Sequence, residues 1–186
     1  MKKRRQSGFT LVELALVMGI SIFVAGALIG MFQAHIQMLS QALKYNFLAQ
    51  DAPAIGLLLT RTIGNAEDYR IYSSGSLARS SNATPVLTGP AVKLWMRQPN
   101  STFRQVVVSF ETPTSGPFSG HSGIYVFLTD LGTGTFSETP NWELAGSQLK
   151  VATFAFDPTT GAHPGVLLVT LTGTNYEQYI FAAEKK

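Results

Sequence analysis

The sequence predicts an α+β protein in which a long amino-terminal helix and a second, shorter helical stretch precede an antiparallel β-sheet. Three observations support this fold class. Residues 14–32 carry no charge, residues 32–47 carry an apolar stripe with helical spacing, and from residue 71 short apolar runs alternate with Gly-, Ser- and Pro-rich segments. Helices followed by a series of strands are typical of α+β proteins, whose layers bury their apolar faces against one another.

The first helix is expected to cross a membrane. Nineteen uncharged residues, 14–32, span roughly 28 Å at about 1.5 Å per residue, close to the thickness of the hydrocarbon layer. Residues 2–5 are all basic and should stay on the cytoplasmic side, so the rest of the chain would lie outside. Glu13 stands at the edge of the apolar run, where a carboxylate costs free energy unless it is paired.

Helical periodicity continues beyond the membrane segment. An apolar stripe with spacings of four and three should dock on the sheet, and it consists of Phe32, Ile36, Leu39, Leu43 and Phe47. Asp51, two residues before Pro53, indicates a kink or a helix restart. Residues 54–66 again have a helical pattern, and Gly64-Asn65 could end this second helix.

Seven strands are expected in the remainder, separated by loops rich in turn-forming residues. The candidate strands are residues 92–97, 105–111, 123–130, 141–144, 148–156, 165–172 and 176–182. The Val-rich runs at 106–108 and 166–169 are typical of buried central strands. Residues 173–175 should connect the last two strands as a hairpin.

Composition excludes several classes of function. The formal net charge is +3, but the basic residues outside positions 2–5 are scattered, so we expect no nucleic-acid binding. Cysteine is absent, which excludes disulfides, thiolate metal sites and a cysteine nucleophile. Charged residues make up only 13% of the chain, and Gly, Ser and Thr are abundant, as suits a β-rich domain outside the cytoplasm.

One motif at the amino terminus is specific. A short basic leader precedes an apolar helix, and their junction reads Gly8-Phe9-Thr10-Leu11-Val12-Glu13-Leu14. In this motif the chain resembles the type IV pilin and type II secretion pseudopilin superfamily, closely over roughly the first 35 residues and only in layout beyond them. The resemblance implies that a prepilin peptidase cleaves between Gly8 and Phe9. It also implies N-methylation of the new amino terminus, giving N-methylphenylalanine at Phe9.

The resemblance implies a layout of four segments. Residues 1–8 would be the leader, 9–32 a transmembrane helix, 33–68 an amphipathic helical region, and 69–186 a periplasmic antiparallel β domain. The fold would be pilin-like, with the long helix packed on the sheet. The implied partners are other pilin or pseudopilin subunits, the prepilin peptidase, an inner-membrane assembly platform and membrane lipid. The implied location is the bacterial inner membrane, single-pass with a cytoplasmic amino terminus, and then the filament.

Glu13 has a physical reason to act in assembly. Cleavage would leave an α-amino group at Phe9, one helical turn before Glu13. In a filament the carboxylate could meet the amino terminus of a neighbouring subunit, which would remove the cost of an unpaired charge and set the subunit register. The alternative is an interfacial residue that reaches the headgroups. Gly26 and Gly30 have the GxxxG spacing that allows helices to pack closely in a membrane. Where many pilins have proline, this chain has Gly30.

The sequence offers little for catalysis, cofactors or metals. His35, His121 and His163 are far apart, and no hydrolase, zinc-protease or P-loop motif occurs. The acids have no EF-hand spacing, so we expect no metal site and no cofactor. Among the aromatic residues, Trp95 lies in an apolar run that indicates core burial, whereas Trp142 and, with it, Phe136 are candidates for an exposed recognition patch.

The leading hypothesis is therefore a structural protein and no enzyme: a processed subunit of a pilin-like filament, specifically a minor pseudopilin of a type II secretion system. The large, irregular β region favours a minor subunit, and the missing disulfide favours a pseudopilin over a pilus subunit. A type IV pilus minor pilin or a competence pseudopilin is the alternative within this class. Two other classes remain open. One is a membrane-anchored periplasmic binding module that does not polymerise, and the other a secreted enzyme whose signal peptide is cleaved after Ala27.

Overall fold

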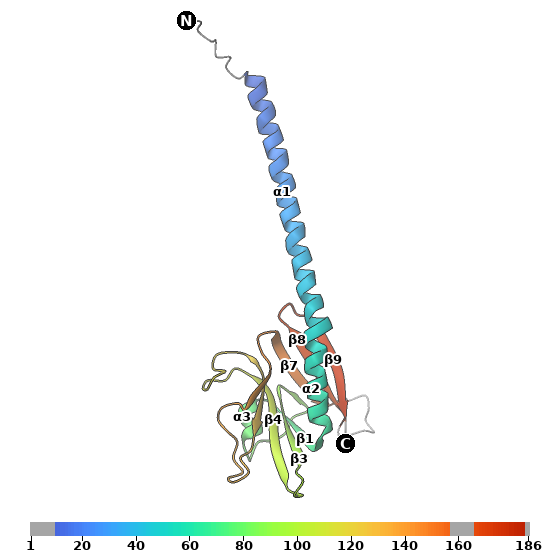
Figure 1. Ribbon diagram of the computed structural model, residues 1–186, viewed down its shortest axis with the longest axis vertical. Coiled ribbons are helices and arrows are strands. Elements are labelled where there is room, and N and C mark those ends of the chain that lie inside the picture. The colour runs from blue at the N-terminus through green and yellow to red at the C-terminus, as the bar shows by residue number, and fades with distance from the viewer. Residues whose placement is uncertain (1–9, 157–165, 185–186) are drawn as a thin grey trace. The chain divides into compact units, whose positions relative to one another are not determined.

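The computed structural model describes residues 10–156 and 166–184 (Figure 1). The chain divides into two compact units, residues 1–43 and 44–186, which are described separately. The described part of the first unit is helix α1 (Leu11–Asn46), whose last residues continue into the second unit. The second unit holds the other described helices and the described strands, so the α+β fold class is confirmed.

Helix α1 exposes apolar side chains around its whole circumference. Leu11, Phe23 and Met31 are each at least 74% exposed, and consecutive positions such as Leu16, Val17 and Met18 are all exposed. A helix that is apolar on every side is normally surrounded by lipid or by other helices. Among the described residues, one helical stretch, which starts at Leu11, is long and apolar enough to span a membrane.

The helix passes into the second unit through a π-helical turn. This turn, η1 (Phe47–Asp51), leads without interruption into α2 (Ala52–Gly64), in which Pro53 occupies one of the first two positions. Proline has no N–H and its ring clashes with the carbonyl four residues earlier, so a wider turn accommodates it. The predicted kink or restart at Asp51 is therefore a local π turn in a continuous helix.

The strands form two antiparallel sheets where one was predicted. The first sheet has the order β1-β3-β4-β5-β6 and consists of β1 (Ala66–Tyr72), β3 (Ala91–Arg97), β4 (Phe103–Glu111), β5 (Gly123–Leu128) and β6 (Trp142–Ala145). The second has the order β2-β7-β8-β9 and consists of β2 (Thr88–Gly89), β7 (Leu149–Phe156), β8 (Val166–Gly173) and β9 (Gln178–Glu184).

The main core lies between these sheets and α2. Leu59 and Ile63 of α2 are completely buried, as are Leu94 of β3 and Phe154 of β7. Figure 1 shows α2 alongside β9, and the two elements pack against each other. Phe47, the last residue of the predicted stripe, is buried in this core, whereas Phe32, Ile36, Leu39 and Leu43 are exposed on α1. The predicted docking of the stripe on the sheet is thus confirmed at Phe47 and wrong for the other four residues, and the helical packing on the sheet comes from α2.

A second, smaller core covers the opposite face of the five-stranded sheet, called here the outer face. Side chains in a strand alternate between faces, so Val92 and Leu94 enter the main core while Ala91 and Lys93 lie on the outer face. The short helix α3 (Gly75–Arg79), which was not predicted from the sequence, packs on this face through Ala78. The hydroxyl of Ser74 caps α3 by accepting a hydrogen bond from the amide of Leu77 at 3.2 Å.

Candidate functional site

The two residues of the predicted processing site, Gly8 and Phe9, lie outside the described residues. Cleavage between them and methylation of Phe9 therefore remain predictions. The description begins at Thr10, immediately before the first turn of α1, and includes Glu13 within that turn.

Thr10 and Glu13 form a capping box at the start of α1. The amide and the hydroxyl of Thr10 both donate hydrogen bonds to Oε2 of Glu13, at 2.8 and 3.0 Å. In return, the Thr10 hydroxyl oxygen accepts a hydrogen bond from the amide of Glu13 at 3.3 Å. This reciprocal arrangement satisfies backbone donors that a helix start would otherwise leave unpaired.

The capping box gives Glu13 a role within its own chain. The carboxylate also lies in the first helical turn, where the helix dipole stabilises negative charge. The hydrogen bonds from Thr10 use Oε2, and Oε1 takes no part in them. Both residues are exposed, so Oε1 is accessible to a donor from outside the chain. The sequence pattern Thr-x-x-Glu at 10–13 is the signature of a capping box, although this role of Glu13 was not predicted.

Gly26 and Gly30 lie on one face of α1, and both are exposed. A Cβ atom built at either position would meet no atom within 4 Å. Within the single chain, the space that each glycine leaves open is therefore unused. Their predicted role in packing against another helix remains a prediction.

The described histidines and acids do not gather into a metal site. His35 and His121 are both exposed and lie in different units, while His163 is outside the described residues. Within residues 10–156 and 166–184, no group of three or more His, Cys, Asp or Glu side chains could hold a metal ion.

The aromatic candidates lie in different environments. Trp142 on the edge strand β6 is 56% exposed, as an open recognition residue would be. Trp95 is only half-buried and lies on the outer face of β3, with the guanidinium of Arg70 over its ring at 5.2 Å. The interpretation of Trp95 as a core residue is therefore wrong. Side chains alternate between the two faces of a strand, so Leu94 and Met96 face the main core and Trp95 faces the opposite side.

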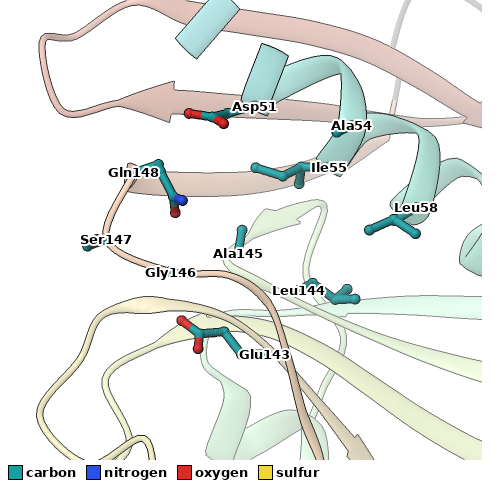
Figure 2. Close-up of a pocket in the computed structure, with 10 residues that line it drawn as sticks. All are labelled: Asp51, Ala54, Ile55, Leu58, Glu143, Leu144, Ala145, Gly146, Ser147 and Gln148. Atoms are coloured by element: carbon teal, nitrogen blue, oxygen red, sulfur yellow. The ribbon is translucent and has the colours of Figure 1, made fainter. Parts of the chain in front are cut away.

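A hollow of about 440 Å³ lies between the start of α2 and the connection from β6 to β7 (Figure 2). Asp51 and Ile55 line it from the helical side, and Glu143 and Gln148 line it from the strands. Its two carboxylates make it acidic, but its described residues include no nucleophile paired with a base. The hollow thus has no catalytic constellation that could indicate an enzyme.

Comparison with known families identifies the amino-terminal motif. Residues 3–29 match the family model of the prokaryotic N-terminal methylation motif, which is of the prepilin type. Searches of the curated proteins and of the solved structures found no significant match. The motif and the α+β pilin-like architecture, a long apolar helix followed by antiparallel sheets, are consistent with the type IV pilin and pseudopilin superfamily. The motif supports processing by a prepilin peptidase and assembly with other pilin subunits, and it is typical of structural proteins.

Proposed function

We propose that this chain is a structural subunit, and specifically a minor pseudopilin, of the pilin-like filament of a type II secretion system. The observation that carries the proposal is the prepilin-type methylation motif at residues 3–29, which includes the exposed apolar first part of α1. The leader, residues 1–8, would be removed at the cytoplasmic face of the inner membrane. Residues 9–32 would hold the mature subunit in the bilayer until assembly, with the β domain in the periplasm.

Assembly in this proposal depends on the start of α1. Cleavage places a methylated amino group on Phe9, four residues before Glu13. A neighbouring subunit's amino group can donate to Oε1 of Glu13 while Oε2 keeps its bonds to Thr10. The pairing of opposite charges offsets the cost of a carboxylate in an apolar bundle. Gly26 and Gly30 would let neighbouring helices approach closely.

The choice among filament systems rests on two sequence features. The chain has no cysteine, and many pilus subunits close a carboxy-terminal loop with a disulfide, which favours a pseudopilin. The large, irregular β region favours a minor subunit. The alternatives are a type IV pilus minor pilin, a competence pseudopilin, or a membrane-anchored binding module that does not polymerise.

The intact mass of the mature protein tests the proposal. We expect the mass of residues 9–186 plus one methyl group. An uncleaved chain would favour a plain membrane anchor, and cleavage after Ala27 would indicate a secreted protein. Cross-linking of the mature chain in membranes and in sheared filaments would then separate a polymerising subunit from a binding module, because only the subunit should be recovered in filaments.

A further inference from the structure

A basic hollow of about 810 Å³ lies over the outer face of the five-stranded sheet. Its defining residues are three cations and three aromatic rings: Arg70, Arg79, Lys93, Tyr72, Trp95 and Phe136. Most of the remaining lining is serine, threonine and glutamine, and one exposed acid, Glu138, also lines it. The volume lies within the range of pockets that bind a drug-sized ligand.

Lys93 is the least usual group in the basic hollow, because it is a cation whose side chain is almost fully buried. It is 5% exposed, and its ammonium lies 5.6 Å from the ring centre of Tyr72 and 5.4 Å from that of Phe136. The ammonium donates one hydrogen bond, to the carbonyl of Ser80 at 3.1 Å. Burial, with the charge of Arg70 nearby, lowers the pKa of Lys93. A buried cation is costly unless a negative group accompanies it.

Arg70 lies directly opposite Lys93 in the register between β1 and β3. Like charges at opposed positions on one face of a sheet repel each other and destabilise it. The ion pairs between Arg79 and Glu111 and between Arg97 and Glu67 involve neither Arg70 nor Lys93. Two adjacent cations thus gather at one place in the hollow, and an anion between them would relieve their repulsion.

The charge of Arg79 is already neutralised by an ion pair with Glu111. Its guanidinium donates to both carboxylate oxygens of Glu111, at 3.0 and 3.1 Å, and lies 3.9 Å from the ring centre of Phe127. The hydroxyl of Ser109 also donates to Glu111, at 2.9 Å. These hydrogen bonds fix the Arg79 side chain in the lining of the basic hollow. Arg70 and Lys93 are therefore the cations of the hollow that are available to a ligand.

We propose that the basic hollow binds an acidic peptide segment of a partner protein, with an aspartate or glutamate carboxylate placed between Arg70 and Lys93. Charge-assisted hydrogen bonds from a guanidinium and an ammonium are the usual recognition of a carboxylate. The rings of Trp95 and Phe136 offer apolar contact to the flanking residues, and the hydroxyl and amide groups of the lining suit a peptide backbone. The proposal is independent of the filament function, because it concerns only the β domain.

The two tryptophans provide a direct assay. Trp95 lines the hollow and Trp142 does not, so the full chain with Trp142→Phe carries its only tryptophan at the site. In detergent micelles, its fluorescence should change saturably on titration with a peptide of alternating glutamate and serine. A matched glutamine–serine peptide should produce no saturable change. The Trp95→Phe chain, whose fluorescence comes from Trp142, should show no response to either peptide.

Substitutions then locate the binding. Arg70→Gln and Lys93→Met should each raise the dissociation constant of the acidic peptide about tenfold. This is the loss of affinity expected when one charge-assisted hydrogen bond is removed. Lys150→Met, which removes a cation stacked on Tyr176 outside the hollow, is the matched control and should bind normally. Equal weakening by all three variants would mean nonspecific charge attraction and would overturn the proposal. Saturable binding of an oligouronate but not of the acidic peptide would also overturn it, in favour of an acidic sugar.

Discussion

The amide and the hydroxyl of Thr10 donate to the same carboxylate oxygen of Glu13, so the acid at the edge of the apolar helix is also the cap of that helix. Two roles are therefore assigned to Glu13. The cap needs only an acceptor at this position, whereas pairing with a neighbouring amino group needs the negative charge. A neutral residue that retains an acceptor separates the two roles.

Glu13→Gln should reduce incorporation into filaments about tenfold, because glutamine can still cap the helix but cannot pair with an amino group. Glu13→Ala should reduce incorporation at least as much, and processing should continue in both variants. The measurement is the fraction of mature chain in sheared filaments, normalised to the membrane pool. Normal incorporation of Glu13→Gln together with a defect in Glu13→Ala would assign Glu13 to the cap alone.

Phe47→Ala should destabilise the β domain by about 3 kcal/mol, since it leaves a cavity where an aromatic ring is 4% exposed in the main core. Phe32→Ala is the matched control, because Phe32 belongs to the same predicted stripe but is 67% exposed on α1. It should change the stability of the β domain by less than about 0.5 kcal/mol. Urea denaturation of the full chain in micelles, followed by tryptophan fluorescence, measures both. Similar losses in the two variants would contradict the assignment of Phe47 to the core.

The seven predicted strands are all present, because each is marked in the sequence by an apolar run or by alternation between loops rich in turn-forming residues. Strand β1 was not predicted, since its second and third residues are Glu67 and Asp68, which are poor strand formers. Asp68 is held in the strand by pairing with Trp95 of β3. The basic hollow on the outer face was not predicted either, because it depends on contacts between distant parts of the sequence. Lys93 looks like an isolated polar residue in an apolar run, and its proximity to Arg70 depends on a register between strands that are distant in sequence.

The amino-terminal motif could be recognised from the sequence more readily than the basic hollow, because its residues are adjacent in the sequence. A carboxylate beside a long apolar run is visible in the sequence, and the Gly8–Phe9 junction lies next to it. The division into two sheets could not be predicted in the same way. It depends on strand pairing: β6 pairs with β5, whereas β7, the next strand in the sequence, pairs with β8 and with the two-residue strand β2.

Gly89→Ala should destabilise the β domain by about 2 kcal/mol, because a Cβ at Gly89 would collide with the carbonyl of Tyr72, a backbone group that cannot rotate away. Gly64→Ala is the matched control. Its Cβ would lie 3.6 Å from the carbonyl of Glu184, an ordinary contact, at the end of α2, where alanine is the better helix former. The urea midpoints of the two variants test this: that of Gly89→Ala should fall, and that of Gly64→Ala should not. An unchanged midpoint for Gly89→Ala would show that β2 can shift to admit a methyl group.

Lys93→Met should stabilise the β domain near neutral pH by about 1 kcal/mol, even though it removes a group that we propose binds a ligand. Methionine fills a similar volume, and the variant removes both the buried cation and its repulsion of Arg70. The folded-state pKa of Lys93 is lowered below the unfolded value of about 10.5, so the unfolded chain binds more protons between the two values. The stability of the natural chain should therefore gain relative to that of Lys93→Met as the pH rises through this window.

The difference in urea stability between the natural chain and Lys93→Met, measured from pH 7 to 10.5, tests this expectation. Tyr69 and Tyr125, whose pKa values are raised by burial, titrate at high pH in both proteins, so their effects cancel in the difference. The greater stability of Lys93→Met should shrink as the pH rises, because Lys93 loses its proton in the folded state and a neutral lysine is less costly to bury. If Lys93→Met is instead less stable at every pH, the bond from Lys93 to the Ser80 carbonyl outweighs the burial of its charge, and Lys93 contributes to the stability of the fold.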